Sequence, residues 1–392
     1  MRATSHRFDP DGGVRVAFVS LASAVGQVLA VGFPSTELPQ ELRLRIARSE
    51  VGFAMLFRPN IENPPQVAGL VADIRAASPP DAACLVATDQ EGGLVQRLRA
   101  PLTVWPDMLS VAGAGDLART GQVGRALGDE LAALGIAWDF APVLDVHTNP
   151  SNPVIANRAF GTTPAAVIAH ALSFWRGLRG AGVLGCGKHF PGHGDTTSDS
   201  HLELPLVAHP LSRLRQIELA PFAAAARAGL EAIMTAHVVF SAVDPGQPAT
   251  LSHAVLTGIL RGELGYRGVI VSDDLGMKAV ADAFSVEELA VRAVAAGCDV
   301  LIIREPAARQ VAAFEAIRAE AEHSPAFRRR VEESAARVAA FKAGSRVGPP
   351  APTAALASLL GTPAHRALAA SFPPIDPLAA ASAAARSPVV DA

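Results

Sequence analysis

The sequence contains few cysteines, and their placement argues against a disulfide-bonded protein. Only three occur in 392 residues, and no C-x-x-C pair of the kind found in zinc sites is present. Cys84, Cys186 and Cys298 are roughly a hundred residues apart, and each lies inside or beside an apolar segment. An odd number of widely spaced, apolar-flanked cysteines indicates buried thiols in a reducing compartment.

The chain also lacks a charge of one dominant sign. Its 34 basic and 37 acidic residues leave a formal net charge of -3, and no run of five like charges occurs. A chain without a surplus or a run of basic residues lacks the positive charge with which proteins usually bind nucleic acid. We therefore expect no nucleic-acid partner.

No segment reads convincingly as a membrane anchor or a secretion signal. The most apolar early stretch, residues 16–33, is interrupted by Ser20, Ser23 and Gln27, follows charged residues and has no clear small-residue cleavage site. Together with the unpaired thiols, this predicts a cytoplasmic protein that does not enter the membrane.

Aromatic residues make up 5% of the chain, with one tyrosine and three tryptophans. A long polysaccharide groove normally needs several aromatic platforms, so this scarcity favours a small pocket.

Eight short apolar runs recur along the chain, separated by segments with helical periodicity. This alternation predicts strand and helix units, and we expect a single α/β domain folded as a (β/α)8 TIM-type barrel. An open, doubly wound sheet is the alternative. The barrel should span residues 1–372, followed by a flexible tail rich in Ala and Pro over residues 373–392. The runs are residues 28–33, 51–57, 84–90, 138–145, 182–190, 232–240, 268–275 and 299–304.

Helices are expected between and after these runs. The boundaries are clearest for residues 285–297, where Ser285 and Glu288 form a capping-box pattern and Gly297 suits a left-handed C-terminal residue. The other predicted helices are residues 39–50, 64–77, 122–135, 164–182, 211–229, 325–344 and 362–372.

Polar residues gather at the C-terminal ends of the apolar runs. In a barrel these ends meet on one face, which is where barrel enzymes carry their chemistry. An open sheet would spread the same residues along an edge. The residues are Asp89, Asp145, Lys188, His189, His237, Asp273, Asp274 and Arg304.

The stretch "KHFPGHGDTTSDSH", residues 188–201, begins a segment that shows no helical or strand pattern as far as Pro210. Unpatterned segments of this length in compact domains are usually functional or disordered, and this composition is too specific for disorder. His189 and His193 have the i, i+4 spacing of a helical zinc site. Pro191 and Gly192 between them disfavour a helix, and no Glu follows His189, so a metal site is the weaker interpretation.

Asp199 and His201 place a carboxylate two residues before an imidazole. Such a carboxylate can hold one ring nitrogen, and a histidine with a pKa near 6.5 is suited to donate a proton and take it back at neutral pH. Asp273 and Asp274 end an apolar strand, and a buried charge is costly without a purpose. Strand alternation sends these two side chains to opposite sides, so one should face the site and the other should cap the following helix.

These motifs resemble a known family. The loop stretch, together with "ATDQEGGLVQRLR", "APVLDV", "NRAFG" and "VSDDLGM", is similar to the bacterial β-N-acetylglucosaminidases of glycoside hydrolase family 3, the NagZ type, over nearly all of the chain. The resemblance implies a single barrel and hydrolysis with retention through a covalent glycosyl-enzyme. The implied substrate is a terminal β-linked N-acetylglucosamine, carried on a 1,6-anhydromuramoyl fragment of peptidoglycan if the enzyme serves cell-wall recycling.

The resemblance also assigns roles to residues. Asp273 would be the nucleophile, and His201 the acid/base with Asp199 as its partner. No cofactor or metal is implied, and the oligomeric state is left open. The residues that would hold sugar hydroxyls are Asp89, Arg97, Arg158, Lys188 and His189.

Several alternatives stay open at this point. A β-glucosidase of the same family is one, and a non-catalytic sugar binder or a metal-dependent hydrolase built on His189, His193 and His201 are others. A phosphorylase is a further one, because a neutral histidine base adds no negative charge to repel phosphate. Simpler structural roles are also conceivable for four residues: Asp89 capping the turn at Gly92 and Gly93, Arg158 pairing with Asp145, and His193 and His237 as core histidines.

Overall fold

The computed structural model describes residues 20–198, 200 and 204–375. In that part of the chain, eight parallel strands form a sheet in the order β6-β3-β2-β1-β12-β11-β9-β7. Parallel bridges from Trp138 to Leu184 and from Val143 to Lys188 join the two outer strands, so the sheet closes into a barrel. The predicted (β/α)8 barrel is confirmed, and the open sheet is excluded.

Each of the eight predicted apolar runs contains one barrel strand. The strands are β1 (Leu29–Val31), β2 (Phe53–Leu56), β3 (Leu85–Thr88), β6 (Trp138–Asp139), β7 (Cys186–Phe190), β9 (Ala232–Thr235), β11 (Val269–Asp274) and β12 (Val300–Ile303).

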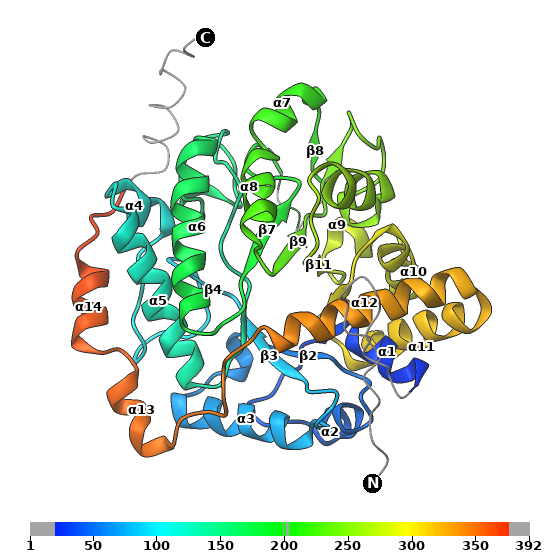
Figure 1. Ribbon diagram of the computed structural model, residues 1–392, viewed down its shortest axis with the longest axis horizontal. Coiled ribbons are helices and arrows are strands. Elements are labelled where there is room, and N and C mark those ends of the chain that lie inside the picture. The colour runs from blue at the N-terminus through cyan, green and yellow to red at the C-terminus, as the bar shows by residue number, and fades with distance from the viewer. Residues whose placement is uncertain (1–19, 199, 201–203, 376–392) are drawn as a thin grey trace, which may run out of the picture.

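Helices surround the strands on the outside of the barrel (Figure 1). The crossover segments are α2 (Gln40–Ala47), α3 (Pro64–Ala77), α5 (Leu117–Ala133), α6 (Pro164–Gly180), α8 (Ala220–Ala228), the π-helical η4 (Ala254–Glu263) and α10 (Val286–Ala296), and α11 (Ala307–His323) follows the last strand. The remaining elements are α1 (Leu21–Gln27), η1 (Arg58–Asn60), β4 (Gln90–Gly92), β5 (Val95–Gln96), α4 (Met108–Gly113), η2 (Ala156–Arg158), β8 (Leu206–Val207), α7 (Leu211–Gln216), β10 (Val239–Phe240), η3 (Ala249–Leu251), α9 (Lys278–Ala281), α12 (Pro325–Ala343), α13 (Thr353–Leu359) and α14 (Pro363–Ala370).

Residues 20–33, the described part of the apolar stretch near the N-terminus, belong to the barrel domain. Within it, Ser20 caps α1 by accepting a hydrogen bond from the Ser23 N–H, and β1 follows directly. None of the helices in the described part of the chain combines the length and hydropathy needed to cross a bilayer.

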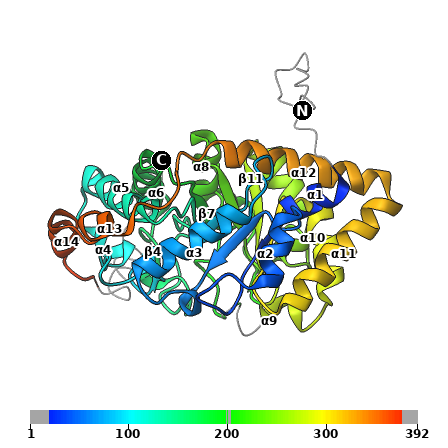
Figure 2. The same cartoon turned by 90° about the horizontal axis from the view of Figure 1, so that it is seen from below.

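The barrel interior is filled by aromatic and aliphatic side chains. The Trp138 ring lies 4.8 Å from the rings of Phe53 and Phe140 and 4.9 Å from that of Phe341, measured between centroids. Phe341 belongs to α12, which crosses the N-terminal end of the barrel beside α1 (Figure 2). The neighbouring Lys342 donates to the carbonyls of Gly52 and Ala83, so α12 closes this end.

The predicted caps of α10 are present with one difference. The Ser285 hydroxyl accepts from the Glu288 N–H at 3.2 Å, and Gly297 ends the helix with φ 136°. The Glu288 carboxylate, however, pairs with Arg292 at 2.9 Å instead of reaching back to the cap. The helix limits follow the sequence pattern all the same.

Two helix predictions need correction. Residues 211–229 form two helices, because Pro221 has no N–H and its ring excludes a helical carbonyl four residues earlier. The predicted helix 122–135 begins earlier, at Leu117, where the Asp116 carboxylate caps it. The crossover η4 and the helix α11, which follows the last strand, were not predicted.

Only the first three residues of the predicted tail, 373–375, belong to the described part of the chain. Ile375 donates its N–H to the Ser110 hydroxyl at 3.0 Å. Residues 376–392 lie outside the described part of the chain, so the division into a barrel of residues 1–372 and a flexible tail stays a prediction.

A buried ionic cluster ties β12 to its neighbours at the N-terminal end of the barrel. The Asp299 side chain is fully buried and accepts from Arg330 at 2.9 Å and Arg337 at 3.1 Å, both on α12. It also accepts from Arg261 and from the Ile270 N–H of β11.

We predict that Asp299→Asn lowers the free energy of unfolding by roughly 3–5 kcal/mol, because it leaves three partly buried arginines without their shared, fully buried counter-charge. Urea denaturation of both proteins measures the difference. Glu315→Gln, which removes the exposed ion pair with Arg318, is the matched control and should leave the midpoint unchanged. Equal midpoints for Asp299→Asn and the wild type would contradict this role.

Candidate active site

A cavity of about 310 Å³ opens at the C-terminal ends of the barrel strands. Its size is at the lower end of the range for small-molecule sites, which suits a single small ligand better than a polymer. Asp199 and His201 lie outside the described residues. The other six predicted site residues all line the cavity: Asp89, Arg97, Arg158, Lys188, His189 and Asp273.

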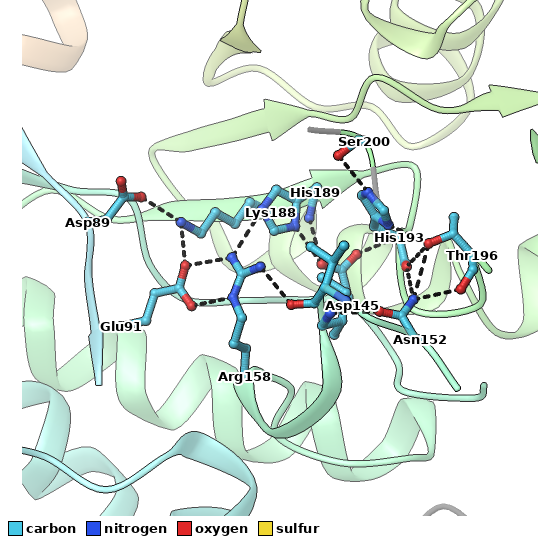
Figure 3. Close-up of polar contacts among 12 residues, drawn as sticks. Asp89, Glu91, Asp145, Asn152, Arg158, Lys188, His189, His193, Thr196 and Ser200 are labelled. Atoms are coloured by element: carbon cyan, nitrogen blue, oxygen red, sulfur yellow. Dashed lines mark hydrogen bonds and ion pairs between the residues drawn. The ribbon is translucent and has the colours of Figure 1, made fainter. Parts of the chain in front are cut away.

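Lys188 forms the centre of the charged side chains in the cavity (Figure 3). Its side chain is 2% exposed, and its ammonium lies 2.8 Å from Asp89 Oδ1 and 2.6 Å from Glu91 Oε1. Arg97 donates to the other oxygen of Asp89 at 3.1 Å. Arg158 binds both oxygens of Glu91, at 2.9 and 2.8 Å. Three cations thus hold two carboxylates in fixed positions.

The cluster stays charged despite its burial. Burial alone would raise the pKa of Glu91, but the nearby charges of Arg158 and Lys188 lower it to about 2. Burial opposes ionisation of Asp89 as well, yet Lys188 and Arg97 hold its pKa below the usual value. For Lys188, burial would lower the pKa, and the two carboxylates raise it instead. All three groups are therefore ionised at neutral pH.

A second network orients the two histidines of the loop. Asp145 is fully buried, and its Oδ2 lies 2.7 Å from His189 Nδ1, while its Oδ1 accepts from the His193 N–H at 2.6 Å. Arg158 Nη2 lies 3.4 Å from His189 Nε2. Because a guanidinium can only donate, Nε2 accepts and Nδ1 carries the proton toward Asp145. Burial, followed by the nearby His189, lowers the pKa of His193 to about 4, so that ring is neutral at neutral pH.

The first part of the loop is fixed in place. His193 Nδ1 lies 2.7 Å from the Thr196 hydroxyl, and Nε2 lies 3.0 Å from the Ser200 hydroxyl. Asn152 donates to the carbonyls of His193 and Thr196 (Figure 3). Gly194 passes so close to the Val146 carbonyl that a Cβ would lie 1.9 Å from the oxygen, so only glycine fits.

These contacts bear on the metal interpretation. Both ring nitrogens of His193 and Nδ1 of His189 are occupied by hydrogen bonds. Among the residues that the structure describes, no group of three His, Cys, Asp or Glu side chains could hold a metal ion.

At the end of β11, Asp273 Oδ1 accepts from the Asp274 N–H at 2.8 Å. Asp274 was expected to cap the following helix, and this expectation is wrong. Its carboxylate accepts from the Gly276 N–H at 2.9 Å, within the turn, and α9 begins after Met277 without a side-chain cap. Asp274 also lines the cavity, and burial, together with the nearby Asp273, raises its pKa.

The simpler structural roles considered for Asp89 and Arg158 do not hold. Asp89 binds two cations instead of capping a turn, and Arg158 pairs with Glu91 instead of Asp145. Glu91 was not among the predicted residues, although it stands inside the quoted motif "ATDQEGG" and two residues after Asp89. The partnership of Asp145 with His189 was missed as well.

The cavity also contains an aromatic side chain that was not predicted. Phe57, just after β2, lies under the Arg304 guanidinium, which is 4.1 Å from the ring centroid. Both residues line the cavity. No sequence pattern singled out Phe57, since it is simply the last residue of an apolar run.

We predict that Glu91→Gln lowers the free energy of unfolding at pH 7 by roughly 3–5 kcal/mol, because Arg158 and Lys188 lose a shared counter-charge. The folded-state pKa of Glu91 lies below its ordinary value, so its contribution is complete above that ordinary value and is lost as the pH falls toward 2. Denaturant titrations from pH 7 to pH 3 should therefore show the difference between wild type and variant shrinking below about pH 4.5. A difference that grows on acidification would contradict this assignment.

Comparison with known proteins agrees with this geometry. Residues 20–341 match the family model described as the glycosyl hydrolase family 3 N terminal domain. The chain is 42% identical over 274 residues to a beta-hexosaminidase of Neisseria meningitidis serogroup C, covering 68% of this chain and 74% of the relative.

Solved structures are similar as well. One is a family 3 beta-N-acetylglucosaminidase from Paenibacillus sp., with a TM-score of 0.86 and 41% identity, covering 90% of this chain and 68% of that one. Another is NagZ from Neisseria gonorrhoeae in complex with N-trifluoroacetyl-D-glucosamine, with a TM-score of 0.73 and 33% identity, covering 88% and 96%. The family match spans the barrel and every residue that lines the charged cavity, so this chain is a glycoside hydrolase and belongs to glycosyl hydrolase family 3.

Proposed function

We propose that this protein is an exo-acting β-N-acetylglucosaminidase that works with retention of configuration. The observation that carries the proposal is the position of Asp273, a carboxylate at the end of β11 that lines the same small cavity as the charged cluster around Lys188. The relatives named beta-hexosaminidase and the NagZ complex with an N-acylated glucosamine support N-acetylglucosamine as the sugar.

In this proposal the charged cluster holds the sugar. Asp89, Arg97, Lys188, Arg158 and His189 would bind its hydroxyl groups, and each hydrogen bond to an ionised group contributes about 1.5–3 kcal/mol. Because these charges already neutralise one another, they can bind a neutral sugar without having to reorganise around it. The cavity volume of about 310 Å³ favours one terminal residue of a chain over an internal one.

The chemistry would take two steps. Asp273 attacks the anomeric carbon while the glycosidic bond breaks, and His201 donates a proton to the departing oxygen. A water molecule then attacks the same carbon and gives a proton to His201. The ester bond between that carbon and Asp273 breaks in this step, which restores the carboxylate of Asp273. Two inversions give net retention. Asp199 would hold the His201 ring during both proton transfers.

The proposal extends to the natural substrate. We infer that the sugar is carried on a 1,6-anhydromuramoyl fragment of peptidoglycan and that the enzyme acts in the cytoplasm. The support for this finer statement is the resemblance of the loop motif to the NagZ type and the three buried free thiols.

We predict that the wild type releases the chromophore from a 4-nitrophenyl β-N-acetylglucosaminide much faster than from the matching β-glucoside, and that Asp273→Ala removes both activities. NMR of the first sugar formed should show the β-anomer, and added phosphate should yield no sugar phosphate. A preference for the glucoside would favour a β-glucosidase, and sugar 1-phosphate would favour a phosphorylase. Near-normal turnover by Asp273→Ala would remove the nucleophile assignment.

We predict that His201→Ala slows hydrolysis of a disaccharide by about 10²- to 10⁴-fold, because a sugar leaving group needs a proton. A 2,4-dinitrophenyl glycoside leaves without one, so its first step should change little. Steady-state and burst kinetics on the two substrates measure the contrast. Equal losses on both would show that His201 is not the general acid.

A further inference from the structure

His237 lies beside the end of the strand that carries Asp273. The residue follows β9, which pairs with β11, and its side chain is fully buried. Its Nε2 lies 3.0 Å from the backbone carbonyl oxygen of Asp274, and its Nδ1 lies 2.8 Å from the Thr250 hydroxyl. Both ring nitrogens are therefore engaged.

The partners of the ring fix the direction of these hydrogen bonds. A carbonyl can only accept, so Nε2 carries the hydrogen and donates to Asp274. In the neutral ring Nδ1 then accepts, and the Thr250 hydroxyl shares its hydrogen between Nδ1 and the Ala236 carbonyl oxygen, which lies 3.1 Å away. The Thr235 hydroxyl lies 2.7 Å from that of Thr250 and can donate in turn. The chain of bonds runs from Thr235 through Thr250 and His237 to the Asp274 carbonyl.

This segment of β11 is not fixed by regular strand pairing. The register between β11 and β12 shifts between Val271, which pairs with Val300, and Asp274, which pairs with Ile302, so Asp273 lies in the irregular part of the ladder. The Leu275 N–H still donates to the Ile302 carbonyl at 2.9 Å, and side chains add further bonds. The Ser272 hydroxyl accepts from the Ile302 N–H at 3.0 Å, and His237 donates to the Asp274 carbonyl. Irregularities of this kind re-aim a side chain near a site, and the new direction has to be held.

The hydrogen bond from His237 to the Asp274 carbonyl affects the position of the Asp273 carboxylate. The Asp274 N–H donates to Asp273 Oδ1 at 2.8 Å, and the Asp274 carboxylate is bound by the turn at Gly276. The Asp274 carbonyl accepts both from His237 and from the Met277 N–H at 3.0 Å, so Asp274 is fixed at its N–H, its carboxylate and its carbonyl. Its N–H therefore stays in position to orient the carboxylate of Asp273.

We propose that His237 is a positioning residue, which holds the backbone of Asp274 so that Asp273 is aimed at the anomeric carbon. The inference rests on the proposed function, in which Asp273 is the nucleophile. A histidine that only filled the core would contribute to stability, whereas a positioning histidine also changes the rate at which Asp273 forms its covalent bond.

The test uses a probe that reports on this bond alone. In a 5-fluoro-β-N-acetylglucosaminyl fluoride, the bond to fluoride breaks with its electron pair, and Asp273 forms an ester with the anomeric carbon. Fluoride departs without a proton from a general acid. Mass spectrometry of the tryptic peptide of residues 268–278, which contains Asp273, follows the labelling.

We expect His237→Asn to slow labelling by about 10- to 100-fold, the range expected when a reacting group is displaced by up to about 1 Å. The inhibition constant for the probe should stay within about threefold, because the charges around Lys188 are untouched. His237→Gln should recover most of the rate, since its longer side chain can present an N–H where Nε2 stood. Asparagine is one carbon shorter and cannot.

A matched control comes from another buried histidine. His170 is on α6, is 8% exposed, and has its Nδ1 2.8 Å from the hydroxyl of Thr120 on α5. His170→Asn removes an equivalent histidine–threonine bond away from the cavity. This variant should lose stability and keep the labelling rate of the wild type.

Each outcome decides a different point. Labelling of folded His237→Asn at the wild-type rate would overturn the role of His237 alone. Absence of label on Asp273 in the wild type would overturn the proposed function and the role of His237 with it. If His237→Asn does not fold, Thr250→Val removes the hydroxyl that orients the ring and keeps the volume. It should slow labelling several-fold, and an unchanged rate there would also overturn the inference.

Discussion

The ammonium group of Lys188 between two buried carboxylates is the interaction on which the cavity depends. Lys188 extends from β7, whereas Asp89 and Glu91 follow β3, so the contact passes over β6, which lies between those strands. Burying any one of these charges alone would cost several kcal/mol, and together they are stable only in a fixed arrangement. Asp139 at the end of β6 fits this constraint: burial raises its pKa well above the usual value, whereas the paired carboxylates of Asp89 and Glu91 have lowered pKa values.

Fixed charges of this kind suit a glycoside hydrolase, because they cost no reorganisation when a transition state forms. The cations Lys188, Arg97 and Arg158 are already bound to carboxylates, and His189 is bound to Asp145. A neutral sugar can therefore bind without separating an ion pair. The carboxylate of Asp273 differs from these groups, because no cation among the described residues pairs with it. In the proposed mechanism, this leaves the carboxylate of Asp273 available to act as the nucleophile.

The sequence allowed the barrel and the lining of the cavity to be predicted, but not how the lining residues pair. Strand ends are local features, and parallel strands in a barrel bring them to one face, so Asp89, Lys188 and Asp273 could be placed together. The pairing of Arg158 with Glu91 joins residues that are 67 positions apart and depends on how far each side chain reaches. Pro221 alone indicates the break that precedes it. The flanking segments both have strong helical patterns, however, and these patterns favour one continuous helix.

The two ends of the barrel solve the problem of buried charge in opposite ways. At the N-terminal end, Asp299 is one anion surrounded by arginines, two of which belong to α12. Asp299 has no exposed surface at this covered end. At the C-terminal end, Lys188 is one cation held by two anions, and this cluster opens into the cavity. An enclosed cluster can only stabilise the fold. An open one also has hydrogen-bonding capacity left for a ligand, so the cluster around Lys188 can contribute both to stability and to binding.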